Sequence, residues 1–298
     1  MNQPIPPTRI AEIIEDALAG CGFSSTLREW LALPLRQPGK LLAGSSRWPL
    51  LVLAAAESAG GGRSAAERVA AAVEIFMAGV DVLDEIEDAD PSPLVAAAGM
   101  PQALNAGAAL LMLGQQVLAD VVNDGVPPDR AYRLQRELLD AALRAAGGQH
   151  LDLAAEGASV TSSDEAFQVV QLKAGALVAG ACCLGALLGT DDVTVLALYE
   201  EWGRHWGAAA QLENDLRDAT EESGKRDRER EKGTLPLVYA REAPEASGED
   251  LPPDALVGSD ALGFTQLVIE VERQRAAMAL DALTARGQDV AALRELMG

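Results

Sequence analysis

The chain has 298 residues, of which 49% are hydrophobic, 23% charged and 4% aromatic, so it is long enough for one large domain or two ordinary ones with a substantial core. Its 24 basic and 45 acidic residues give a formal net charge of −21. This balance argues against nucleic acid and anionic membrane surfaces as partners, since both recruit basic patches, and it suits a protein that gathers divalent cations.

The periodicity of the sequence predicts helices from end to end. Apolar residues recur at spacings of three and four, and no long window alternates with period two. We expect helices at residues 8–20, 25–34, 46–60, 64–89, 101–123, 128–157, 163–189, 191–222, 234–242, 260–286 and 289–297. No repeat or linker interrupts this pattern. We therefore predict a single all-helical domain over residues 1–298, packed around a central cavity.

The cysteines and the apolar stretches bear on the cellular compartment. Three cysteines, two of them adjacent, form no disulfide framework, which favours reduced thiols in the cytoplasm. Residues 1–30 show no basic start followed by an apolar run, so we expect no signal peptide. The longest apolar stretch, 174–189, is short for a membrane span and rich in Gly and Ala. We interpret it as a buried core helix and expect no stable membrane insertion.

Two acidic clusters are the strongest candidates for a metal site. In the first, Asp84 and Asp88 are four residues apart, so both carboxylates leave one helical face. In the second, Asn214, Asp218 and Glu222 follow each other at intervals of four and form one stripe. Like charges at this spacing destabilise a helix unless a cation neutralises them, and Mg²⁺ prefers such oxygen ligands.

Each cluster alone is more often a solvated acidic helix end. The pair favours a functional interpretation, because each cluster follows a long apolar helix. A cationic segment that includes Lys225, Arg226 and Lys232 comes directly after the second cluster. Two metal-binding faces beside cations would form a site for a diphosphate carried by metal.

At this point the sequence resembles the trans-isoprenyl diphosphate synthase, or polyprenyl synthetase, superfamily. Six segments occur in the family's order over most of residues 35–240. They are a GGKRxRP-like segment at 39–53 that includes Arg47, a DDxxD-like motif at 84–88, a GQxxDL-like segment at 148–153, a KTG-like segment at 172–175, a QxxDDxxD-like motif at 211–218 and a KxTLP-like segment at 232–237. No single motif is decisive, but six in order are strong evidence.

The resemblance implies a bundle of about ten or more antiparallel helices around a cavity, with the acidic motifs facing each other across its mouth. It also implies about three Mg²⁺ ions, an allylic prenyl diphosphate substrate and a homodimer. The metal ligands would be Asp84, Asp88, Asn214, Asp218 and Glu222. The diphosphate would be bound by Lys173, Lys225, Arg226, Lys232 and Arg47, and the site would also be lined by Gln149, Asp152 and Gln211.

The sequence departs from the family on one side of this site. Synthases that add isopentenyl diphosphate carry two Arg where this chain has Pro93 and Leu94, and the GGKRxRP-like segment is also distorted. Glu85 replaces the second Asp of the first motif, and the second motif begins with Asn214. The departures therefore favour a terpene synthase or a prenyltransferase with a non-standard acceptor. A chain-elongating synthase and a non-catalytic subunit remain the alternatives.

The residues before the first motif bear on the length of the prenyl chain. In the family these positions form the floor of the product cavity, and here they are the small Val80 and Gly79, with Phe76 and Met77 one or two turns deeper. This pattern favours a C15 or C20 chain, although Phe76 and Met77 could also be ordinary core residues. We expect His150 to be a partly buried structural residue.

Overall fold

The computed structural model describes residues 8–20, 22, 24–155, 162–220, 233–242 and 260–297, and within these ranges it contains helices and no strand. This confirms the all-α prediction; the extent of one domain over residues 1–298 stays a prediction. The elements are α1 (Thr8–Gly20), α2 (Ser25–Leu35), η1 (Leu41–Ala43), α3 (Arg47–Ala59), α4 (Arg63–Glu87), α5 (Pro93–Ala98), α6 (Met100–Ala119), η2 (Asp120–Asp124), α7 (Pro128–Ala155), α8 (Ser163–Val170), η3 (Gln171–Gly175), α9 (Ala176–Ala186), α10 (Val193–Thr220), α12 (Leu235–Glu242), α13 (Asp260–Ala285) and α14 (Ala291–Leu296).

Two local features differ from the periodicity-based prediction. The predicted helix 163–189 is interrupted by η3, a turn of π-helix between α8 and α9. The short helix α5 was not predicted, although its start signals are present: the Ser92 hydroxyl accepts a hydrogen bond from the Val95 N–H at 3.3 Å, and Pro93 occupies the first helical position. A six-residue helix is too short for a periodicity signal to reveal.

Helix α4 forms the centre of the larger part of the core and packs closely on α6. Its side chains are buried over most of the stretch from Ala65 to Val82. Glycines allow the close approach, since a Cβ at Gly79 would lie 2.9 Å from the Gly107 carbonyl oxygen and one at Gly114 would lie 2.8 Å from the Ala72 carbonyl oxygen. The apolar floor predicted at Gly79 is therefore a helix-packing contact.

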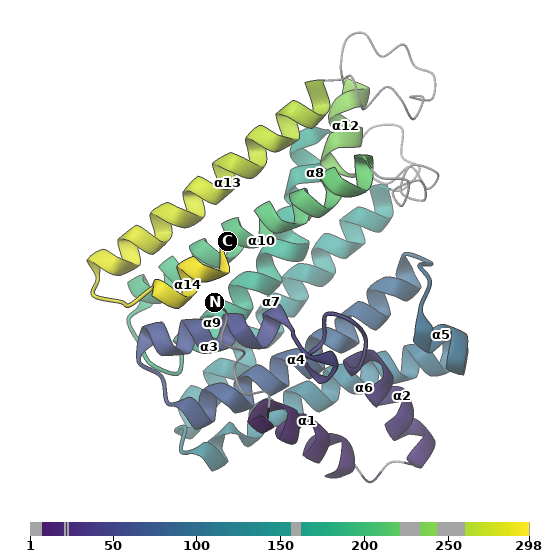
Figure 1. The fold of residues 1–298 in the computed structure, drawn as a ribbon, viewed down its shortest axis with the longest axis vertical. Helices are drawn as coiled ribbons and strands as arrows, with labels where there is room; N and C mark the ends of the chain where they lie inside the picture. Colours follow the sequence, from purple (N-terminus) through teal and green to yellow (C-terminus); the bar gives the residue numbers. More distant parts are fainter. Residues whose placement is uncertain are drawn as a thin grey trace.

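The two ends of the bundle have separate groups of buried apolar residues. One includes residues of α1 to α7, α9, the first half of α10, the second half of α13 and α14, and the other joins α8, the second half of α10, α12 and the first half of α13. Figure 1 shows α13 running alongside α10 on the flank opposite α5. Helices α10 and α13 thus link the two groups.

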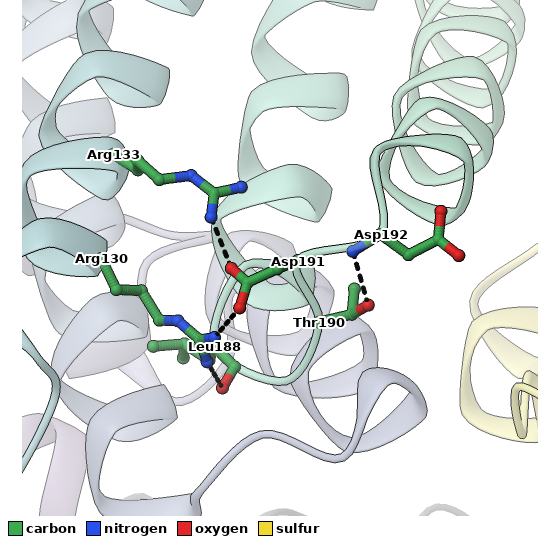
Figure 2. Close-up of polar contacts among 6 residues, drawn as sticks. All are labelled: Arg130, Arg133, Leu188, Thr190, Asp191 and Asp192. Atoms are coloured by element: carbon green, nitrogen blue, oxygen red, sulfur yellow. Dashed lines mark hydrogen bonds and ion pairs between the residues drawn. The ribbon is translucent and has the colours of Figure 1, made fainter.

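The turn between α9 and α10 fixes where α10 begins. Asp191 pairs with both Arg130 and Arg133 of α7, and Arg130 also donates to the Leu188 carbonyl oxygen at 3.0 Å (Figure 2). Asp192 then accepts hydrogen bonds from the first backbone N–H groups of α10, including that of Thr194 at 2.8 Å. These contacts tie α10 to α7, and both helices line the cavity described next.

Candidate active site

A cavity of about 600 Å³ opens in the middle of the bundle. Seven helical elements line it: α3, α4, α6, α7, η3, α9 and α10. Helices α4, α7 and α10 contribute most of the side chains, spaced mostly three or four residues apart. The lining residues are Arg47, Trp48, Leu51, Phe76, Met77, Val80, Asp81, Leu83, Asp84, Glu87, Leu111, Ala142, Ala145, Ala146, Gln149, His150, Leu153, Lys173, Ala174, Leu177, Val178, Trp206, Gly207, Ala210, Gln211 and Asn214. Most of this wall is apolar.

Polar residues gather at one end of the rows of side chains on α4 and α10. On α4 the buried Phe76 and Met77 precede Asp84 by about two helical turns, and on α10 Trp206 precedes Gln211 and Asn214 in the same way. The cavity therefore has an apolar part and a polar part, as an amphiphile with a charged head and an apolar tail requires.

Lys173 lies at the centre of the polar part, between carboxylates from two helices. Its ammonium nitrogen is 2.9 Å from Oδ1 of Asp84 on α4 and 3.4 Å from Oδ2 of Asp152 on α7. Burial lowers the pKa of Lys173, but Asp84, Asp152 and Asp88 raise it by more, so the net shift is upward and the lysine stays charged.

The π-helical turn η3 and a glycine of α7 bring Lys173 to this position. A Cβ at Gly148 would lie 2.8 Å from the backbone nitrogen of Lys173, so only glycine allows this approach of α7 to η3. π-helical turns occur often at functional sites. The sequence predicts Lys173 as a site residue, but its helical periodicity gives no sign of the π turn.

Asp88 ends α4 and is held at the edge of the polar part. It is 5% exposed, and its Oδ1 accepts a hydrogen bond from Nε2 of Gln149 at 3.3 Å. Ala89 follows with φ of 47°, in place of the glycine that usually turns the chain at a helix end. The amide oxygen of Gln149, Oε1, is buried and has no hydrogen-bond partner among the described residues, so it is available to a ligand or a water.

The second acidic motif lies on α10, which follows Lys173 in the chain, whereas the first lies at the end of α4, which precedes it. Gln211 and Asn214 line the cavity, Gln211 donates to the buried Asp215 at 2.8 Å, and Arg217 donates to the Asn214 side chain. Asp218 lies one turn further along the same face and is half-buried. Glu222, Lys225, Arg226 and Lys232 lie outside the described residues, so their predicted roles are not addressed by the structure.

Most of the other predicted site residues line the cavity, and Gly79, Asp88, Asp152 and Asp218 do not. Arg47, Phe76, Met77, Val80, Gln149, Gln211 and Asn214 all do so. Gly79 does not, because it faces Gly107 of α6. Asp88 and Asp152 are not on the cavity surface but contact Gln149 and Lys173, which are.

The sequence analysis missed several residues of the wall. Trp48, Leu51 and Trp206 line the cavity, and Trp206 stacks on Trp202 with ring centroids 5.5 Å apart. His150 is exposed and also lines the cavity, so the expectation of a partly buried structural residue is wrong. Trp206, Ala210 and Asn214 follow each other at intervals of four, and this spacing was the available signal for this face of α10.

The donor set of the polar part suits Mg²⁺. Asp84, Asp88, Asn214 and Asp218 offer only carboxylate and amide oxygens, which are the ligands Mg²⁺ prefers. Among the residues that the structure describes, no three His, Cys, Asp or Glu side chains converge to cage one ion.

The charges of the cavity wall are also compatible with a bound cation. Asp81, Asp84 and Glu87 line the cavity with only two described cations, Arg47 and Lys173. A diphosphate would bring further negative charge to a wall that already carries more acids than bases. Metal ions would reverse this balance.

Glu74 holds the segment that carries Lys40 and Arg47. It is fully buried in α4, and its carboxylate accepts hydrogen bonds from the Leu41 N–H at 2.7 Å and from the Ser46 hydroxyl at 2.6 Å. Burial raises the pKa of Glu74, although these hydrogen bonds and Lys40 oppose the shift. Both oxygens are thus used to fix the loop between α2 and α3.

Replacing Glu74 by alanine is expected to destabilise the fold by about 2–4 kcal/mol, because two buried donors lose their acceptor. Glu74→Gln is the matched control: its amide oxygen can still accept from Leu41, and its amide nitrogen can donate to Ser46. Glu74→Gln should lower the free energy of unfolding by clearly less than Glu74→Ala does. The measurement is the free energy of unfolding in urea, and equal losses in the two variants would contradict the role given to these hydrogen bonds.

Comparison with known proteins identifies the family of the chain. A match to the polyprenyl synthetase family spans residues 28–252. The chain belongs to the polyprenyl synthetase family. This confirms the resemblance seen in the six motifs, and all of them lie within the matched range.

Several members of the polyprenyl synthetase family are similar to the chain. A geranylgeranyl diphosphate synthase from Mycobacterium tuberculosis is 29% identical over 274 residues, which are 83% of this chain and 77% of that protein. Geranylgeranyl pyrophosphate synthase 10 from Arabidopsis thaliana is 29% identical over 214 residues, 64% of this chain and 62% of that protein. The tryptophan prenyltransferase ComQ of Bacillus subtilis subsp. natto is 31% identical over 152 residues, 51% of this chain and 44% of that protein.

A solved structure shares the fold of this polyprenyl synthetase. The geranylgeranyl pyrophosphate synthetase of Pyrococcus horikoshii Ot3 superimposes with a TM-score of 0.77 and 24% sequence identity, covering 92% of this chain and 91% of that one. The helical bundle predicted from the resemblance is thereby confirmed.

Proposed function

We propose that this polyprenyl synthetase is a Mg²⁺-dependent prenyltransferase that ionises an allylic prenyl diphosphate and releases diphosphate. The observation that carries the proposal is the cavity itself, which has a long apolar wall and ends at Lys173 and the carboxylates around it. The prenyl chain would fill the apolar part, and the diphosphate would meet the polar part.

The polar residues of the site have two distinct roles in this mechanism. Arg47 and Lys173 would bind the diphosphate, and Asp84, Asp88, Asn214 and Asp218 would hold the metal, with Glu222 added by family position. Bound Mg²⁺ would stabilise the negative charge that develops on the leaving diphosphate. By family resemblance we propose about three ions.

The apolar part of the wall would protect the allylic cation after the diphosphate leaves. Its side chains exclude water, which would otherwise capture the cation. The aromatic faces of Trp48, Phe76 and Trp206 would favour positive charge beside them. Catalysis would therefore depend on the shape of the cavity as much as on the metal site.

The acceptor is the finer part of the proposal. Leu94 is buried at 1% exposure, and Pro93 is the first residue of α5, so neither provides a cation for a second diphosphate. We therefore favour an acceptor other than isopentenyl diphosphate. The named relatives are chain-elongating synthases and a tryptophan prenyltransferase, so transfer is better supported than terpene cyclisation.

Incubation with Mg²⁺ and geranyl, farnesyl or geranylgeranyl diphosphate, each with and without isopentenyl diphosphate, tests this proposal. Extracted products and released diphosphate would be measured. Activity that yields a longer diphosphate only when isopentenyl diphosphate is present would make the protein a chain-elongating synthase. Release without isopentenyl diphosphate would support the proposal, and no release in any tube would favour a missing acceptor or a non-catalytic subunit.

Val80 supports the proposed preference for C15 or C20 donors, because it is a small side chain in the cavity wall. Val80→Phe is expected to lower kcat/KM for geranylgeranyl diphosphate about tenfold relative to geranyl diphosphate, since the larger ring shortens the apolar space. The exposed Val122 is the matched control for Val→Phe. Unchanged donor preference in Val80→Phe would contradict this assignment of the chain-length floor.

We also propose that the protein acts in the cytoplasm as a homodimer. The buried, free Cys182 and Cys183 are consistent with a reducing compartment. Two segments, Met100–Asp124 and Ser163–Ala186, are long and apolar enough to cross a membrane. The most apolar 18-residue stretches within them are 44% and 67% buried within the fold. We interpret both as core helices.

The exposed face of α6 supports the dimer. Met100, Leu104 and Met112 of this helix are 55%, 52% and 70% exposed. Met112→Glu is expected to convert the dimer to a monomer in light scattering after gel filtration, because a buried carboxylate would have no partner there. The exposed Met278 on α13 is the control position for Met→Glu. A wild-type monomer would refute the dimer.

A further inference from the structure

A second, smaller pocket of about 110 Å³ adjoins the cavity. It lies between the end of α2, the segment before η1, α4 and the start of α5, and its polar lining residues are Gln37, Lys40, Asp81 and Glu85. Asp81 lines both the pocket and the cavity, so the two spaces share a wall. A small group in this pocket would lie beside the head of a molecule in the cavity.

The charge of this pocket is unsuited to a phosphate. Lys40 is its one cation among the described residues, and the lysine is 8% exposed and paired with Asp81. Glu85 then leaves an excess of negative charge. The remaining wall includes Pro93 and the buried Leu94, which offer no side-chain donors. A diphosphate here would face two carboxylates with no unpaired cation.

The backbone around Lys40 keeps the lysine in this arrangement. Its own N–H donates to the Gln37 carbonyl oxygen at 3.1 Å, and the next N–H, that of Leu41, donates to the buried Glu74 at 2.7 Å. The loop is fixed again at Ser46, which donates to the other oxygen of Glu74. Withdrawing Lys40 from Asp81 would therefore also leave a buried charge without its partner.

We propose that this pocket binds the acceptor of the prenyl group, and that the acceptor carries no phosphate and donates hydrogen bonds to Asp81 and Glu85. Ionised carboxylates accept hydrogen bonds and form strong ones with amines, alcohols and indole N–H groups. The inference rests on the proposed function, because it needs the neighbouring cavity to hold the prenyl donor. It assigns Asp81 and Glu85 to acceptor specificity.

Calorimetric titration of the full chain tests this proposal. The protein is first saturated with Mg²⁺ and farnesyl thiolodiphosphate, a donor analogue that does not ionise readily, and is then titrated with tryptamine or with isopentenyl diphosphate. Tryptamine presents both an amine and an indole N–H, and we expect it to bind more tightly than isopentenyl diphosphate. Glu85→Gln is expected to weaken tryptamine about tenfold.

Glu67→Gln, at the other end of α4, is the matched control and should leave tryptamine binding unchanged. Tighter binding of isopentenyl diphosphate, no binding of tryptamine, or equal affinities in wild type and Glu85→Gln would each overturn the proposal while leaving the proposed function standing. Failure of the thiolodiphosphate itself to bind would overturn the proposed function, and the acceptor pocket with it.

Discussion

Asp84→Ala is expected to lower the rate of diphosphate release from farnesyl diphosphate about a thousandfold, while the helical fold stays intact. Asp84 lies in the cavity wall and is both a proposed metal ligand and the nearest carboxylate to Lys173. Its loss would remove one proposed metal contact and the closer of the two ion-pair partners of Lys173. The side chain is 40% exposed, so the cost in folding free energy should be small.

Asp90→Ala is the matched control, because Asp90 is an exposed carboxylate just beyond the end of α4. It should release diphosphate at the wild-type rate. Asp218→Ala, on the facing motif, should behave like Asp84→Ala. Circular dichroism and the unfolding midpoint would show that the variants are folded, and normal turnover in both Asp84→Ala and Asp218→Ala would refute the site assignment.

Glu272→Ala is expected to cost about 3–5 kcal/mol in the free energy of unfolding, because it breaks a buried ion-pair network. Glu272 of α13 is 1% exposed; its Oε2 lies 2.6 Å from Nδ1 of His205 on α10, and its Oε1 accepts from Arg275 at 2.9 Å. Without Glu272, His205 would remain buried beside Arg204, which contacts its other ring nitrogen. The network fastens α13 to the helix that carries Trp206.

Glu270→Ala is the matched control, since Glu270 is an exposed acid on the same helix, and it should change stability by less than about 0.5 kcal/mol. Urea unfolding followed by circular dichroism measures both variants. A loss below about 1 kcal/mol for Glu272→Ala would contradict the structural role of the network.

The same network predicts a pH dependence. Burial alone would raise the pKa of Glu272, but the hydrogen bond and charge of His205, together with Arg275, lower it below the ordinary 4.5. A lowered carboxyl pKa contributes stability above the unfolded-state pKa and loses it as pH falls through the folded-state value. The stability difference between wild type and Glu272→Gln should therefore shrink as the pH falls below 4.5.

Much of the fold could be predicted from the sequence because helical periodicity is a local signal. The predicted bounds of the helices at 8–20, 128–157 and 260–286 differ from the observed ones by at most two residues. The acidic motifs and Lys173 could be placed in one site because the family resemblance orders segments that are distant in the chain. The catalytic and metal-binding roles of these residues stay predictions.

What could not be predicted depends on contacts between distant segments. Residue spacing alone does not determine which neighbouring element a helical residue faces. Gly79 was therefore predicted to line the cavity, whereas it packs on α6. The π-helical turn at Lys173 depends on Gly148 in another helix, and the pairing of Lys40 with Asp81 joins residues 41 positions apart. Neither interaction has a periodic signature.

Binding of farnesyl thiolodiphosphate with and without Mg²⁺ tests most directly whether the cavity is a metal-dependent prenyl diphosphate site, because the measurement needs no acceptor. We predict micromolar binding to the wild-type chain with Mg²⁺, and at least about tenfold weaker binding when EDTA removes the metal or when Asp84 is alanine. Binding of equal strength with and without Mg²⁺, or no binding under either condition, would contradict the proposed site.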